Sequence, residues 1–306
     1  MSDILKLVNI TKTFSGHGII PSKQNVHKAV NNVSFGIEKG TVFGLVGESG
    51  CGKTTLARAI LLLDPPTKGK IIFDGSDMAV LSGKKLLPYR MKTQIVFQDP
   101  HSALNPKLSI YKSMREGLVN RSYPKEKIKG KIEELLGLVG ITPSHMHRFP
   151  HEFSGGQKQR IVIARALSME PELLILDEPV SSLDVSIQAQ IINLLLDLKD
   201  KFALTYLFIS HDLNLVSYLS DRIGVMYKGR IIEMGDAVSI MKNPGHPYTV
   251  KLFSSAPGKM DKRTKGTPGT RPELIPPEGY SFNPEDDNTF ELVNIEDGHL
   301  VGCYKT

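Results

Sequence analysis

The chain has few cysteines and lacks any segment typical of a membrane span or a secretion signal. Its two cysteines, Cys51 and Cys303, are far apart and belong to no Cys-x-x-Cys or Cys/His cluster. This argues against a disulfide framework or a structural zinc site and indicates a reducing compartment. The N-terminus shows no basic-then-apolar signal segment, and no run of about 18 uninterrupted apolar residues occurs. We therefore expect a protein that does not span a membrane by itself.

The charge balance also excludes little. The formal net charge is +6, but the lysines and arginines are scattered among 32 acidic residues. The richest basic run, residues 125–131, is predicted to be a solvated helix face. Charge alone therefore indicates neither nucleic acid nor an anionic bilayer as a partner. With 306 residues and 40% hydrophobic content, the chain can bury a full α/β core.

A glycine-rich stretch fits the phosphate-binding loop pattern G-x-x-x-x-G-K-[ST]. The pattern is matched by Gly47, Glu48, Ser49, Gly50, Cys51, Gly52, Lys53 and Thr54. An apolar run at 41–46 predicts a strand before it, and residues 55–60 predict a helix after it. The glycines let successive N–H groups point at phosphate oxygens, while Lys53 supplies charge and Thr54 a Mg²⁺ ligand. The stretch predicts a nucleotide site, against the alternative of an accidental glycine-rich turn.

Three further predicted strands end on polar side chains that suit catalysis. Residues 173–176 are continuously apolar, which is typical of a strand buried on both faces, and Asp177 and Glu178 follow them. Because ionised carboxylates beside a core need a cation, we expect Asp177 to hold Mg²⁺ and Glu178 to polarise a water. The alternative is two N-cap acids for the next helix. Gln98 and His211 follow the other two strands. A histidine such as His211 would by itself more often have a capping or core role, but its position beside a nucleotide site favours a role in that site.

Residues 106–168 change to helical patterns with few strand signals, which predicts a separate helical subdomain. Within it, Ser154 is a good N-cap for a helix at about 158–167. Gly155 and Gly156, followed by Gln157, leave backbone N–H groups free at the helix start. Local physics alone makes this a second anion site. A further helix begins at residues 182–184.

The ends of the chain give weaker patterns. Residues 5–10 alternate like a strand and a polar turn is predicted at 11–13, so Phe14 suits either purine stacking or a strand-end core position. Residues 15–28 are predicted to be a loop and 29–37 a strand. A hairpin is predicted to turn at Lys228 and Gly229, and a short helix after Gly235 leads to His-Pro-Tyr at 246–248. The proline-punctuated remainder is predicted to be an appended tail.

Five motifs, in this order, resemble those of the ATP-binding cassette (ABC) ATPases. They are the phosphate loop, Gln98, Ser154 to Gln157, Asp177 with Glu178, and His211. The match covers about residues 3–240, and the Ser-Gly-Gly-Gln motif between a glutamine loop and a carboxylate strand is highly specific. The resemblance implies an α/β fold with a phosphate-loop NTPase core: a RecA-like mixed sheet with an antiparallel β subdomain. A helical signature subdomain and a C-terminal extension complete it. The expected domains are residues 1–98 and 170–238 for the core, 99–169 for the helical subdomain and 239–306 for the extension.

The resemblance also implies a role for each matching residue. Phe14 resembles the adenine-stacking aromatic, and residues 47–55, including Thr55, the ATP-binding loop. Thr54, Gln98 and Asp177 resemble the Mg²⁺ ligands, with Gln98 also sensing the attacking water. Glu178 resembles the general base and His211 the histidine that touches the γ-phosphate. The final set concerns a second subunit: Ser154, Gly155, Gly156 and Gln157 resemble the signature that contacts the partner's nucleotide, and Asp184 the aspartate that crosses the dimer interface.

The His-Pro-Tyr segment at 246–248 and the Pro-rich stretch after it resemble the oligopeptide/dipeptide importer ATPases. Such importers pair two different ATPase chains beneath two membrane permease subunits, and an external binding protein delivers the solute. The resemblance implies a peripheral protein on the cytoplasmic face of the cell membrane, with ATP and Mg²⁺ as ligands and no nucleic acid. Its cargo would be a peptide, an oligosaccharide or nickel. The alternatives are a soluble cassette ATPase acting on nucleic acid or ribosomes, and a regulatory ATP-binding module.

The tail lacks the cysteines that many such importers carry there, some of them thought to hold an iron–sulfur cluster. Tyr280 stands at the first cysteine position, the second falls in an acidic run, and Cys303 is the one cysteine left. Because a cluster needs about four thiolates, we predict a tail without metal. It is expected to fold by packing Phe282, Phe290, Leu292 and Val301 against the core or a partner chain. Iron analysis and visible spectra of anaerobically purified protein test this, and stoichiometric iron or a charge-transfer band would refute it.

Overall fold

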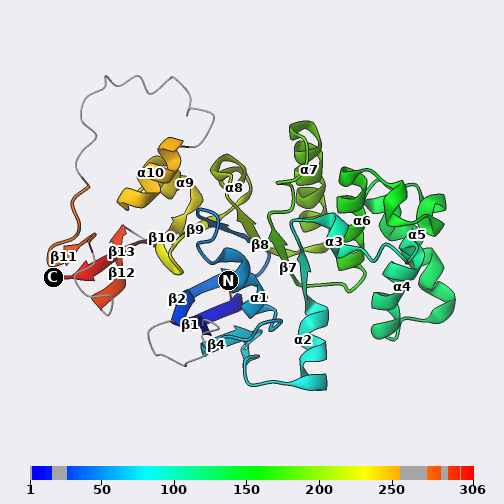
Figure 1. Cartoon of the computed structure of the whole chain (residues 1–306), viewed down its shortest axis with the longest axis horizontal. Coiled ribbons are helices and arrows are strands. Elements are labelled where there is room, and N and C mark those ends of the chain that lie inside the picture. Colours follow the sequence, from blue (N-terminus) through cyan, green and yellow to red (C-terminus); the bar gives the residue numbers. More distant parts are fainter. Residues whose placement is uncertain (1, 16–25, 256–273, 284–288, 297) are drawn as a thin grey trace.

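A large mixed sheet forms the centre of the protein, and a smaller antiparallel sheet packs beside it (Figure 1). The computed structural model describes residues 2–15, 26–255, 274–283, 289–296 and 298–306. Most of the loop predicted at 15–28, and tail residues 256–273, lie outside the described residues.

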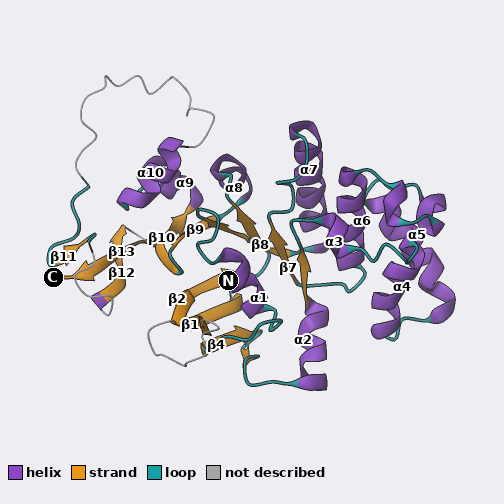
Figure 2. Ribbon diagram, in the orientation of Figure 1, coloured by secondary structure: helices purple, strands orange, loops and turns teal. Residues whose placement is uncertain are grey.

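Figure 2 shows the helices and strands of the chain. The strands are β1 (Asp3–Ser15), β2 (Val26–Glu38), β3 (Val42–Val46), β4 (Lys68–Phe73), β5 (Ser76–Asp77), β6 (Thr93–Val96), β7 (Leu173–Asp177), β8 (Thr205–Ser210), β9 (Arg222–Tyr227), β10 (Arg230–Asp236), β11 (Tyr280–Ser281), β12 (Phe290–Glu296) and β13 (His299–Lys305). The α-helices are α1 (Lys53–Ile60), α2 (Leu87–Lys92), α3 (Pro100–Ala103), α4 (Ile110–Asn120), α5 (Ile128–Leu138), α6 (Gly155–Leu167), α7 (Val185–Phe202), α8 (Leu213–Leu219), α9 (Ala237–Lys242) and α10 (Pro247–Ser255).

The central sheet has a parallel middle and an antiparallel edge. Its order is β11-β13-β10-β9-β3-β8-β7-β6, and β12 pairs with β13. Strands β6, β7, β8, β3 and β9 run parallel to one another. Strand β10 is antiparallel to both of its neighbours, β9 and β13. The carboxyl ends of the parallel strands therefore lie along one edge of the sheet, where ligand sites of open α/β sheets form. The smaller sheet, β2-β1-β4-β5, is antiparallel, as the family resemblance implies.

Two hydrophobic cores lie on opposite faces of the central sheet. In β7, Leu173 and Ile175 pack with the smaller sheet and α1, whereas Leu174 and Leu176 pack with the helices of the other face. Side chains alternate along a strand, so a strand that is apolar throughout is buried on both faces. The sequence-based prediction for this strand is thereby confirmed. Helices α3 to α6 lie together at one end of the molecule, and β11 to β13 lie at the other (Figure 1).

The polar turn predicted at residues 11–13 is wrong, because β1 continues through it to Ser15. Thr11 Oγ1 accepts a hydrogen bond from the Asn32 N–H (3.1 Å), and Thr67 Oγ1 accepts one from the Thr13 N–H (3.1 Å). The register with β2 shifts between Leu7 and Lys12, where a β-bulge absorbs the irregularity. The threonines are polar strand residues with partners in neighbouring segments, so polarity did not indicate a turn here.

The C-terminal extension adds strands to the central sheet. Strand β13 pairs with β10 through Glu233↔Val301 and Met234↔Leu300. Val301 is 1% exposed, and Phe290 and Leu292 pack against the two cores, which confirms the predicted packing of these three residues. Phe282 instead packs edge-on against His246, with ring centroids 5.4 Å apart. The predicted domain boundaries stay predictions.

No helix in the described ranges is long and apolar enough to cross a bilayer.

We predict that Val301→Ala lowers the free energy of unfolding by about 1.5–3 kcal/mol, because it removes two buried methyl groups and leaves a cavity. Val80, which is 76% exposed, provides the matched control. Val80→Ala is expected to change stability by less than about 0.5 kcal/mol. Urea unfolding of both variants measures the difference, and equal effects would mean that β13 does not contribute to the stability of the fold.

Candidate functional site

The phosphate loop between β3 and α1 contains two glycines, Gly47 and Gly52, that leave no room for a side chain. A Cβ on Gly47 would lie 2.2 Å from the Met226 carbonyl oxygen, and one on Gly52 would lie 2.2 Å from that of Ala29. Gly52 also has φ of 114° and caps the N-terminus of α1. The loop is therefore clamped between β2 and β9, and Gly47 and Gly52 are required for steric reasons.

Lys53 folds back over the loop. Its Nζ donates to the carbonyl oxygens of Gly47 (2.7 Å) and Glu48 (2.9 Å). The residue is 5% exposed, so these oxygens satisfy an ammonium group that is nearly buried. Burial raises the pKa of the neighbouring Cys51 thiol, while the charge of Lys53 lowers it in part. The thiol is protonated at neutral pH, so Cys51 contributes packing and backbone groups to the loop.

Thr54 and Asp177 meet where α1 begins and β7 ends. Thr54 Oγ1 donates to Asp177 Oδ1 at 3.3 Å, and Asp177 is 4% exposed. Burial raises the pKa of the Asp177 carboxyl, the charge of Glu178 adds to the increase, and the bond from Thr54 opposes it. A cation would stabilise the ionised form of such a carboxyl. The hydroxyl and carboxylate oxygens are hard donors that fit Mg²⁺.

Glu178 and His211 lie together at the ends of β7 and β8. His211 Nδ1 is 3.3 Å from Glu178 Oε2, and the side chains are 58% and 16% exposed, respectively. Glu178 has φ of 49°, a left-handed conformation that is strained for a residue with a Cβ, and its N–H donates to the Ile209 carbonyl oxygen at 2.9 Å. Such strain is common where a side chain must be presented to a ligand. The structure thus brings together two residues from different predicted strands.

A cleft of about 330 Å³ opens in front of the loop. Its lining comes from both sheets and comprises Phe14, His27, Ala29, Ser49, Gly50, Gly52, Lys53, Thr54, Thr55, Gln98 and Glu178. Phe14 is 42% exposed, which rules out the core role that the sequence left open for it. Lys12 Nζ lies 5.3 Å from the centroid of this ring. Sequence analysis missed His27 and Ala29, because only the β1–β2 register, which pairs Phe14 with His27, places them here.

The signature residues form a capped helix start outside this cleft lining. Ser154 Oγ accepts from the Gln157 N–H (3.3 Å), and Gln157 Oε1 accepts from the Ser154 N–H (3.0 Å). This reciprocal capping box confirms the predicted N-cap. A Cβ on Gly156 would lie 2.6 Å from Ile187 Cγ2, so α6 approaches the start of α7 closely. Asp184, the N-cap residue of α7, is exposed.

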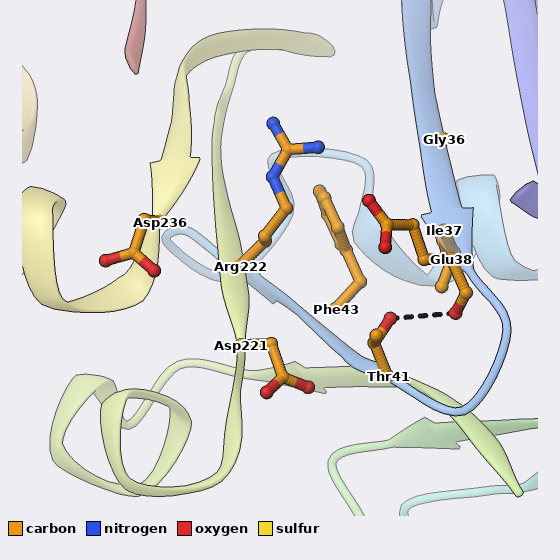
Figure 3. A pocket seen from close by; sticks show the side chains of 8 residues that line it. All are labelled: Gly36, Ile37, Glu38, Thr41, Phe43, Asp221, Arg222 and Asp236. Atoms are coloured by element: carbon orange, nitrogen blue, oxygen red, sulfur yellow. Dashed lines mark hydrogen bonds between the residues drawn. The ribbon is translucent and has the colours of Figure 1, made fainter. Parts of the chain in front are cut away.

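A second hollow, of about 210 Å³, lies at the opposite end of β3 (Figure 3). Arg222 and Glu38 lie on either side of the Phe43 ring there, and Asp221 and Asp236 complete the charged lining. Asp221 Oδ2 accepts from the Val42 N–H (2.8 Å), and Asp236 caps α9. Three carboxylates against one guanidinium would repel a polyphosphate. The cleft at the phosphate loop is therefore the candidate site.

Comparisons with known proteins show which family the chain is similar to. Residues 30–181 match the family model described as ABC transporter. The chain is 49% identical to the oligopeptide transport ATP-binding protein OppF of Streptococcus mutans over 83% of this chain and 82% of that protein. It is 47% identical to the oligopeptide transport ATP-binding protein AppF of Bacillus subtilis over 98% and 97%. The solved structure of cbiO1 from Clostridium perfringens, part of an ABC transporter complex, matches with a TM-score of 0.69 and 30% identity, covering 79% of this chain and 92% of that one.

We predict that Gly52→Ala abolishes ATP binding, because its Cβ cannot fit beside the Ala29 carbonyl oxygen without moving the loop or β2. Gly130 in α5 is the matched control, since a Cβ there meets nothing within 4 Å. Gly130→Ala is expected to retain ATP binding and to leave stability unchanged or raised by up to about 1 kcal/mol. Titration of both full-length variants with a fluorescent ATP analogue measures this. Wild-type affinity in Gly52→Ala would contradict the clamped geometry.

Proposed function

The chain belongs to the ABC transporter family as an ATP-hydrolysing subunit, and from this premise we propose that it powers the uptake of oligopeptides or dipeptides. Peptides are favoured over oligosaccharides or nickel because the relatives that match over most of both chains are named oligopeptide transport proteins. The solute would pass through partner membrane subunits, so this chain supplies the energy and not the binding site for the cargo.

The observation that supports an ATPase site best is the convergence of four strand ends. The phosphate loop follows β3, Gln98 follows β6, Asp177 and Glu178 end β7, and His211 follows β8. These strands run parallel, so the side chains gather at one edge of the sheet, and the loop, Gln98 and Glu178 line one cleft. Lys53, Thr54, Gln98 and Glu178 thus place a basic group, oxygen donors and a carboxylate in the lining of the same cleft.

Each residue has a proposed part in hydrolysis. Phe14 would stack on the adenine ring, and Lys53 with the loop N–H groups would neutralise the β- and γ-phosphates. Thr54, Asp177 and Gln98 would hold Mg²⁺, which supplies charge neutralisation at the phosphates when bound. Glu178 would accept a proton from the water that attacks the γ-phosphorus, as the bond to the β–γ bridging oxygen breaks. His211, beside Glu178, would orient the γ-phosphate.

A second cassette would complete the site. Ser154 and Gln157 are exposed at the start of α6 and are not in the lining of this chain's cleft, and Asp184 is exposed at the start of α7. We infer that Ser154 to Gln157 contact the nucleotide of a second, non-identical ATPase chain and that Asp184 lies at their interface. Two membrane permease subunits would contact the helical subdomain and the Gln98 segment on the cytoplasmic face of the membrane. An external binding protein would deliver the peptide.

We predict that Glu178→Gln retains ATP binding but lowers ATP hydrolysis by at least about a hundredfold, because the amide cannot accept the proton. Peptide uptake by the complex with its membrane partners should fall in parallel. Glu296→Gln at the exposed end of β12, outside the helical subdomain, is the control and should keep both activities. ATP turnover and labelled-peptide uptake are measured in reconstituted vesicles. Near-normal turnover in Glu178→Gln would contradict the assignment of Glu178 as the general base. ATP turnover without peptide uptake in the wild type would contradict the assignment of peptides as the cargo.

A further inference from the structure

The side chain of Tyr248 connects the C-terminal extension to the phosphate loop. Glu48, the first residue after Gly47, donates its backbone N–H to Tyr248 Oη at 3.3 Å, although the two residues are 200 positions apart. Tyr248 belongs to the His-Pro-Tyr segment at the start of α10. Glu48 itself is not in the lining of the cleft, whereas the next residues of the loop, Ser49, Gly50 and Gly52, are.

Tyr248 is held on two sides. Its ring packs on that of Tyr227 at the end of β9, with centroids 4.3 Å apart, and its N–H donates to His246 Nδ1 at 3.0 Å. Burial lowers the pKa of His246 to about 4, so the imidazole is neutral at pH 7 and its nitrogen can accept this bond. Burial likewise raises the pKa of Tyr248 to about 12, so its hydroxyl is protonated and accepts from Glu48 through a lone pair. The hydroxyl position is therefore set by packing, independently of a nucleotide.

A buried carboxylate connects this segment to the last strand. Glu233 on β10 is 0% exposed and accepts from the Gly245 N–H at 2.7 Å and the His246 N–H at 3.0 Å. Its Oε1 is also 2.7 Å from His299 Nε2 on β13. Glu233 thus holds the backbone of Gly245 and His246 and also pairs with His299 on β13. A shift of β13 would be transmitted through Glu233 to the segment that carries Tyr248.

The β9–β10 hairpin also contacts other residues of the phosphate loop. The Gly229 N–H, in the turn between β9 and β10, donates to the Cys51 carbonyl oxygen at 2.9 Å. The Met226 carbonyl oxygen fills the space beside Gly47. Tyr248 therefore adds a third contact, at Glu48, which is an exposed residue of the loop.

We propose that Tyr248 is a positioning residue for the phosphate loop, through which the C-terminal extension sets the affinity for ATP. The inference rests on the proposed nucleotide site and concerns what holds that site in shape. Without the hydroxyl, the Glu48 N–H loses its protein acceptor. The loop backbone at Glu48 then gains conformational freedom, which ATP must remove on binding. Because the loop contacts the nucleotide before and during hydrolysis, the loss affects ground state and transition state alike, so KM should rise while kcat is nearly unchanged.

Tyr248→Phe keeps the ring and removes only the hydroxyl oxygen. Loss of one neutral hydrogen bond predicts a two- to tenfold increase, approximately, in both the Kd of the full-length chain for MgATP and the KM of the assembled complex. Tyr218→Phe is the matched control, since Tyr218 on α8 is 69% exposed, and its Kd and KM should equal those of the wild type. A kcat that falls while KM stays constant, or a wild-type Kd in Tyr248→Phe, overturns the proposal. A wild type that binds no nucleotide overturns the proposed function itself.

A double-mutant cycle tests the link to the extension. His299→Gln alone should raise the Kd for MgATP, because it replaces the imidazole that pairs with Glu233. The same change in the Y248F background should add little, since the link to Glu48 is already broken. Thermal unfolding of all four proteins separates stability from coupling, because a purely structural effect of His299→Gln would lower Tm without this dependence on Tyr248. Additive effects on Kd would overturn the role of the extension.

Discussion

The geometry of this protein depends on the close approach of two backbone carbonyl oxygens to two glycines of the phosphate loop. The Met226 and Ala29 oxygens occupy the positions that Cβ atoms of Gly47 and Gly52 would take. Met226 belongs to the central sheet and Ala29 to the smaller one, so the loop forms only where the two sheets meet. Helix α1, which follows the loop, packs Leu56, Ala57 and Ile60 into the core shared by these sheets. The steric constraint on two glycines thereby sets the relative position of both sheets and of the helix start.

Burial of the neighbouring strands explains why the chemistry gathers at their ends. Strands β7 and β8 are buried along their whole length, with alternate side chains in opposite cores. Charged side chains are costly within such strands, so the carboxylates of Asp177 and Glu178 stand where β7 ends. The left-handed backbone of Glu178 is one local strain that the site retains, and its N–H bond to Ile209 compensates part of it.

Local sequence patterns predict those elements whose structure is determined by residues close to one another in the chain. The strand–loop–helix unit, the doubly buried β7 and the Ser154 cap each follow from periodicity or from spacing within about a dozen residues. Contacts that depend on register were beyond such patterns. The threonines at 11–13 are strand residues only because Asn32 and Thr67 pair with them, and His27 lies in the cleft only because it pairs with Phe14. For the same reason, the pattern of the proline-rich tail did not predict β13. This strand pairs with β10, and the contacting residues Glu233 and His299 are 66 positions apart in the sequence.

Glu233 shows why the extension is part of the cassette fold and not an addition to it. A carboxylate that is 0% exposed in a strand needs its hydrogen bonds, and its described donors come from residues 245, 246 and 299. Loss of any one would leave buried acceptor capacity unsatisfied at a cost of about 1–3 kcal/mol, more for a charged group. An apolar residue would pack at this position without that dependence. The carboxylate therefore makes the β9–β10 hairpin, the His-Pro-Tyr segment and β13 require one another, and the phosphate loop rests on two of the three.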